Sequence, residues 1–125
     1  MFSRLDDELL DHPKLAAAGR ELGRNGRCLA LGFYTYALMW CNRHLSDGLL
    51  PVEIVETFSG FVVDPLRVAE ALQRAGLFDT HERGYRIHDY GEYNPSASEI
   101  KAKRKYERNK KRAQRAAMSR GNGRA

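Results

Sequence analysis

The sequence has few of the residues that form disulfide frameworks, metal centres or nucleotide sites. It contains two cysteines, Cys28 and Cys41, and four histidines. If both cysteines lie on one helix they are too far apart to pair, so we interpret them as reduced thiols. There is no Cys-x-x-Cys or His-x-x-x-His spacing and no glycine-rich phosphate loop, and a group such as Asp79, His81 and His88-Asp89 is usually structural. We therefore expect no catalytic residue, no metal site and no cofactor.

The chain also lacks a hydrophobic run that is both long enough and apolar enough to span a membrane. The most apolar stretch, RCLALGFYTYALMWCNRH from Arg27 to His44, contains the only tryptophan and no acidic residue. Tyr34, Thr35 and Tyr36 make it too polar to span a bilayer. Apolar residues on most of its sides predict instead the buried central helix of a small soluble domain. The two faces expected to pack are Leu29, Phe33, Trp40 and Cys41, and Leu31, Tyr34 and Leu38.

Charge is distributed very unevenly along the chain. The net charge of the 125 residues is +5, but residues 99–125 carry +9 and residues 1–98 carry −4. This asymmetry predicts an acidic folded domain, residues 1–93, followed by a basic tail, residues 94–125, that binds a polyanion. Residues 1–10 contain three acidic side chains and not the apolar segment of a signal peptide, which indicates a cytoplasmic protein.

Two helices are predicted from a capping residue followed by proline. Asp11 or His12 caps a helix that begins at Pro13, and Asp64 caps a helix from Pro65 to Ala75. In the second helix, one face is expected to pack and the opposite face to be exposed. The packed face is Leu66, Ala69, Leu72 and Ala75, and the exposed face is Arg67, Glu70, Ala71 and Arg74, with Gln73 beside it.

The remaining segments predict a small amount of β-structure. Leu49-Leu50 suits a short strand, Val52 to Phe58 a short helix, and Leu77 to His88 a β-hairpin that turns at Glu82-Arg83-Gly84. The predicted fold class is therefore mainly α with a small β-hairpin (α+β). The order helix, helix, strand, helix, helix, hairpin is that of a winged helix-turn-helix, with residues 65–75 as its recognition helix.

Several motifs occur in an order that resembles one known family. They are LDDELLDHPKL near the start, SDGLLP after the central run, AEALQRAGLF, and GYRIHDYGEYNPS before the basic tail. Over residues 5–108 the chain resembles the N-terminal winged-helix domain of phage replisome-organiser and replication-initiation proteins. The resemblance implies binding to origin DNA or to replication proteins such as a helicase. The chain departs from the family pattern at Tyr90, where that pattern has tryptophan.

Candidate DNA contacts lie on the predicted recognition helix and wing. Arg67, Gln73 and Arg74 suit contacts with phosphates and base edges, and Arg83 and Arg86 in the hairpin suit a phosphate or the minor groove. The alternative is a solvated helix face, on which Glu70 pairs with Arg67 or Arg74 at helical spacing. Both interpretations stay open from the sequence.

The tail predicts an exposed helix that begins with a capping box from Ser96 to Glu99. We expect it to run to about Met118, with SRGNGRA disordered and with charge on all sides of the helix. If six of its cations meet phosphates, the slope of log K against log salt is about −5. A membrane surface is disfavoured, because the tail lacks an apolar face. The candidate phosphate contacts are Lys101, Lys103, Arg104, Lys105, Arg108, Lys110, Lys111, Arg112 and Arg115.

These features predict a non-enzymatic DNA-binding protein of phage type, active in replication initiation in the host cytoplasm or in transcriptional control by the same contacts. The alternative is a protein-interaction adaptor, in which the face of helix 65–75 docks a helicase or a repressor. The oligomeric state is left open, because no heptad repeat indicates a coiled coil.

Overall fold

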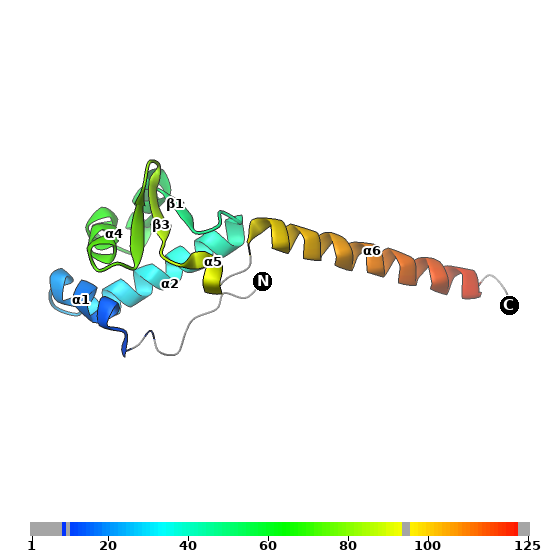
Figure 1. The fold of residues 1–125 in the computed structure, drawn as a ribbon, viewed down its shortest axis with the longest axis horizontal. Coiled ribbons are helices and arrows are strands. Elements are labelled where there is room, and N and C mark those ends of the chain that lie inside the picture. Colours follow the sequence, from blue (N-terminus) through cyan, green and yellow to red (C-terminus); the bar gives the residue numbers. More distant parts are fainter. Residues whose placement is uncertain (1–8, 10, 94–95, 123–125) are drawn as a thin grey trace. The chain divides into compact units, whose positions relative to one another are not determined.

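A computed structural model describes Leu9, residues 11–93 and residues 96–122, and its fold is α+β, as predicted (Figure 1). The chain divides into two compact units, Met1–Asn94 and Pro95–Ala125. In the first unit the helices are α1 (Pro13–Leu22), α2 (Gly26–His44), α3 (Val52–Thr57), the 3-10 helix η2 (Phe58–Gly60), α4 (Pro65–Arg74) and α5 (Tyr90–Tyr93). Its strands are β1 (Leu49–Pro51), β2 (Phe78–His81) and β3 (Gly84–Ile87). The second unit contains α6 (Ala97–Asn122).

The strands form one antiparallel sheet with the order β1-β3-β2. Strands β2 and β3 are the predicted hairpin, and β1 adds a third strand to it, with Leu50 opposite Tyr85. Gly84, at the start of β3, has a φ of 154°. A Cβ atom there would lie 2.6 Å from the carbonyl oxygen of Leu50. Glycine is therefore required where the hairpin meets β1.

The core is built around α2. The ring of Phe33 packs edge-on against Phe58, with centroids 5.2 Å apart, and lies 6.2 Å from the ring of Phe78. The buried stripe of α2 also includes Ala30 and Ala37, which the sequence analysis left out. Leu29, Leu31, Tyr34 and Trp40 are only partly buried. The small side chains of this stripe let neighbouring elements approach the helix closely.

Helices α1 and α2 cross with their backbones in contact. A Cβ atom on Gly26 would lie 2.0 Å from the carbonyl oxygen of Gly19. The turn between the helices uses left-handed backbone at Asn25, with φ 58°, and a positive φ of 84° at Gly23. At the start of α1, His12 is the capping residue, and its Nδ1 accepts a hydrogen bond from the Lys14 N–H at 3.1 Å.

Helix α4 is more deeply packed than the sequence analysis predicted. Val68 and Ala71 are buried, although Ala71 was expected on the exposed face, whereas Leu66 and Ala75 are only partly buried. The cause is that α4 contacts α1, α2, α3 and β2, so more than one side of it is covered. The exposed part of α4 is correspondingly narrow.

Helix α6 extends beyond the predicted end. Residues 119–122, which were expected to be disordered, are helical, and residues 123–125 lie outside the described part of the chain. Adding a residue to an existing helix is much easier than nucleating one, so the preceding Ala, Lys, Arg and Gln residues carry the helix onward. The predicted start is confirmed, because the Glu99 N–H donates to Ser96 Oγ at 3.1 Å.

Candidate nucleic-acid interface

The exposed side of α4 presents one free arginine. The Arg67 N–H donates to Asp64 Oδ1 at 3.4 Å, which caps the helix, and the Arg67 side chain is exposed. Gln73 is partly buried. Among the residues that the structure describes, Arg67 makes no ion pair. Its guanidinium group is therefore available to an external anion.

Arg74, the second arginine proposed for this face, is held by two carboxylates. It donates a hydrogen bond to Glu21 of α1, and its Nη1 lies 3.8 Å from Oε2 of Glu70 one turn earlier. The hydrogen bond to Glu21 raises the pKa of Arg74, and the charges of Glu21 and Glu70 raise it further. The predicted pairing of Glu70 with Arg74 is thus present. The partner in α1 carries no sequence signal, since it lies 53 residues away.

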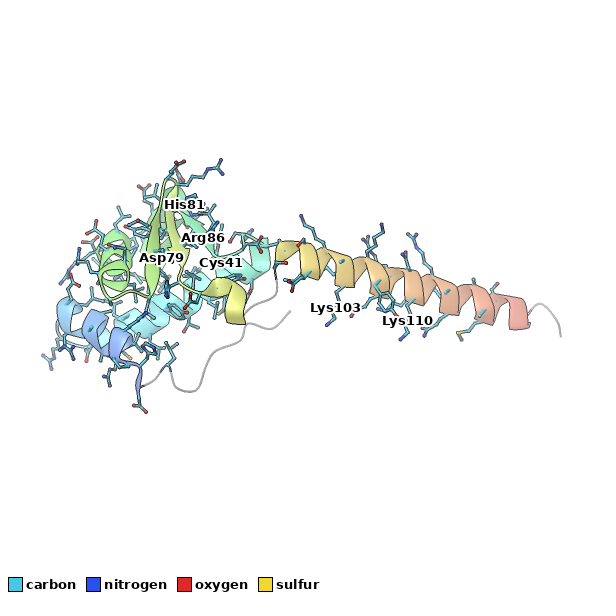
Figure 2. All side chains as sticks on the ribbon, viewed as in Figure 1. Cys41, Asp79, His81, Arg86, Lys103 and Lys110 are labelled. Atoms are coloured by element: carbon cyan, nitrogen blue, oxygen red, sulfur yellow. The ribbon has the colours of Figure 1, made fainter. Side chains whose placement is uncertain are left out.

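The hairpin carries exposed basic residues at its turn and along β3. Arg83 lies in the turn, where its N–H donates to His81 Nδ1 at 3.1 Å, and its side chain is exposed. Arg86 is exposed on β3, directly opposite Asp79 of β2. Figure 2 shows Asp79, His81 and Arg86 on this hairpin. His81 acts as the acceptor that closes the turn, so its role here is structural.

His88 lies between two aspartates. Its Nδ1 is 3.0 Å from Asp79 Oδ2, and its Nε2 is 3.2 Å from Asp89 Oδ2. Asp89 has a positive φ of 54°, a conformation that a short polar side chain tolerates. Both ring nitrogens of His88 thus have acidic partners within the protein. No group of three or more His, Cys, Asp or Glu residues that could hold a metal ion occurs in the described residues.

The lysines and arginines of α6 are not spread evenly around the helix, contrary to the expectation of charge on all sides. At about 100° per residue, seven of them fall in a sector about 120° wide, which we call the basic stripe. Lys103 and Lys110 lie on the side of the helix nearly opposite to the basic stripe. Figure 2 shows these two lysines on the same side of α6. The pattern follows from the sequence alone once the segment is known to form one continuous helix. The basic stripe is Lys101, Arg104, Lys105, Arg108, Lys111, Arg112 and Arg115.

All these cations are exposed and unpaired. Residues 101–119 are exposed, and no lysine or arginine of α6 up to Arg115 makes an ion pair with another described residue. A shallow hollow on the helix is lined by Lys101, Arg104, Arg108 and Lys111 of the basic stripe, together with Glu107. Between Ala97 and Ser119, a third sector has no charged side chain and contains Ala102, Tyr106, Asn109, Ala113 and Ala116.

An exposed aromatic pair, Tyr36 and Phe61, was not predicted from the sequence. The rings of Tyr36 on α2 and Phe61 after η2 are 4.6 Å apart, and they are 44% and 50% exposed. Met39 and Val63 are also exposed, at 51% and 102%. Tyr36 was part of the central aromatic run, but its outward direction depends on the packing of α2 against η2, which no local pattern reveals.

Comparison of the chain with protein-family models, with curated proteins and with solved structures gives no match in any of the three. Within the described ranges, none of the helices combines the length and the apolar character that crossing a bilayer would require.

Proposed function

We propose that the protein is a non-enzymatic DNA-binding protein, in which a winged helix-turn-helix positions the duplex and α6 supplies most of the affinity. The observation that carries this proposal is the row of nine exposed, unpaired cations between Lys101 and Arg115. Cations at this density repel one another, and each contact with a phosphate releases a condensed counterion from DNA. An anionic membrane is a poorer partner, because α6 lacks the large apolar face of a membrane-surface helix.

The arrangement of the first unit supports the winged-helix part of the proposal. Its elements follow the order helix, helix, strand, helix, helix, hairpin, and β1 pairs with the second strand of the hairpin. In a helix-turn-helix, the second helix enters the major groove. In the proposed winged helix, α4 is this second helix and would present Arg67 and Gln73, while the hairpin would present Arg83 and Arg86.

The division of work follows from charge. Residues 1–98 carry a net charge of −4, whereas residues 99–125 carry +9. The first unit by itself is therefore a weak partner for DNA, and its few arginines determine placement more than affinity. We assign the protein to phage replication initiation, as the family resemblance implies, and the same contacts would serve transcriptional control.

A salt titration tests the proposal. Fluorescence anisotropy of the full chain with a labelled duplex of about 30 bp, between about 50 and 300 mM salt, should give a slope of log K against log salt of about −5. Binding that is undetectable at the lowest salt, or a slope near zero, would contradict the proposed function.

Two arginines of α4 form a matched pair for testing the recognition helix. Arg67 is free and Arg74 is held by Glu21 and Glu70. Loss of one phosphate contact reduces the slope by about 0.9. Arg67→Ala should therefore lower the magnitude of the wild-type slope by about 0.9, and Arg74→Ala should leave the slope unchanged. An unchanged slope for Arg67→Ala would show that α4 does not contact the duplex through Arg67.

A second candidate function, binding to a protein partner, is favoured by the exposed aromatic pair of Tyr36 and Phe61. Exposed apolar groups that adjoin one another often mark protein interfaces. A pull-down with the full chain after nuclease treatment tests this function. A partner that is retained by the wild type and lost with Phe61→Ser would support it, whereas loss of every partner on nuclease treatment would count against it.

A further inference from the structure

The seven cations of the basic stripe lie on one side of α6 along a length that suits a nucleic-acid backbone. Lys101 and Arg115 are separated by about 21 Å along the helix axis, at about 1.5 Å per residue. One strand of B-DNA presents a phosphate about every 3.4 Å of its axis, so this length covers about six phosphate steps. The number of cations and the number of phosphates within reach are therefore similar.

The two remaining lysines lie on the far side of the same helix. Lys103 and Lys110 lie about 140–160° from the middle of the basic stripe. A helix with its side chains is about 10–12 Å across, and the Debye length at 0.1 M salt is about 10 Å. If the basic stripe faces the phosphates, the charges of Lys103 and Lys110 are largely screened from them.

We propose that α6 lies against the phosphate backbone of duplex nucleic acid through the basic stripe alone, with Lys103 and Lys110 directed into solvent. This inference rests on the proposed function and specifies which surface of the tail carries it. The charge complementarity is one-sided, because the sector with Ala102, Tyr106, Asn109, Ala113 and Ala116 carries no cation to pair with a phosphate. A helix held inside a groove would instead need cations on both of its flanks.

Two double variants of identical chemistry separate these arrangements. Lys101→Gln with Lys111→Gln removes two charges from the basic stripe, and Lys103→Gln with Lys110→Gln removes two from the far side. Lysine and glutamine have similar helix propensities, and far-UV circular dichroism verifies equal helix content. The readout is the salt slope of duplex binding by the full chain, measured by anisotropy.

We expect the stripe variant to lower the magnitude of the slope by about 1.8, which corresponds to roughly 30-fold weaker binding near 150 mM salt. The far-side variant should bind within about twofold of wild type, with an unchanged slope. Ala113→Lys adds a charge about 140° from the middle of the basic stripe, as far away as Lys103, and should also leave the slope unchanged.

Equal losses in the two double variants would overturn the one-sided arrangement while leaving DNA binding intact. Absence of salt-dependent binding by the wild type would instead refute the proposed function itself. Polyglutamate serves as a competitor that lacks phosphate spacing. Competition by polyglutamate as effective as that by unlabelled duplex, at equal charge concentration, would also overturn the proposal, because any acidic polymer would then suffice.

Discussion

Replacing Gly26 with alanine tests the contact between α1 and α2 most directly. The new Cβ would lie 2.0 Å from the carbonyl oxygen of Gly19 and 2.9 Å from its carbonyl carbon. Both are backbone atoms, so no side chain can rotate away, and the two helices must separate. The displaced interface includes Leu15, Ala18 and Leu22, which are buried in the core.

Overpacking of this kind costs about 1–3 kcal/mol, and occasionally more. For a domain of this size, each kcal/mol shifts Tm by about 4–8 °C. We therefore expect Gly26→Ala to lower Tm by at least about 4 °C. Trp40 fluorescence during thermal unfolding is the suitable assay, because it reports on α2 and not on α6.

Gly32 on the same helix provides the control. It is exposed, and a Cβ atom there would meet nothing within 4 Å. Alanine is favoured over glycine in a helix by about 1 kcal/mol, so Gly32→Ala should stabilise the protein by roughly that amount. A Gly26→Ala variant as stable as wild type would refute the close crossing of α1 and α2.

Two further predictions concern pH and salt. Burial raises the pKa of the Cys41 thiol from 9.0 to about 11 and that of the Tyr90 hydroxyl to about 12, so the folded state holds these protons more tightly than the unfolded state. The associated stability is fully present below about pH 9 and is lost as pH rises towards 11, by about 2–3 kcal/mol for Cys41. Urea unfolding at several pH values should show that the free energy of unfolding declines less steeply with pH in Cys41→Ala than in the wild type. The same decline in both proteins would contradict this assignment. Arg74→Ala should lower Tm slightly at low salt through loss of the exposed pair with Glu21, and the difference from wild type should vanish in high salt.

Features that depend on neighbouring residues were predictable from the sequence. The helix starts at Pro13 and Pro65 follow from local capping chemistry, and the hairpin around Glu82-Arg83 follows from alternation and a glycine. The basic tail was predictable for the same reason, since its charge lies within one continuous segment. The winged helix and its DNA contacts stay predictions.

Features that depend on distant contacts were not predictable. Glu21 and Arg74 meet only because α1 packs against α4. Ala30 and Ala37 are buried because other elements approach α2 closely on that side, whereas large residues such as Trp40 lie towards the edge of the core. Helical spacing identifies possible faces of an apolar helix, but only packing decides which face is innermost.

The short strand β1 has a consequence for how the hairpin could report on a ligand. The Val52 N–H donates to the Arg83 carbonyl oxygen at 2.8 Å, and the Ile87 N–H donates to the Gly48 carbonyl oxygen at 2.9 Å. The turn of the hairpin is thereby joined to the first residue of α3. Amide hydrogen exchange at Val52 should therefore slow when a bound ligand immobilises Arg83. The exchange rate of this amide would thus report on ligand binding at the hairpin turn.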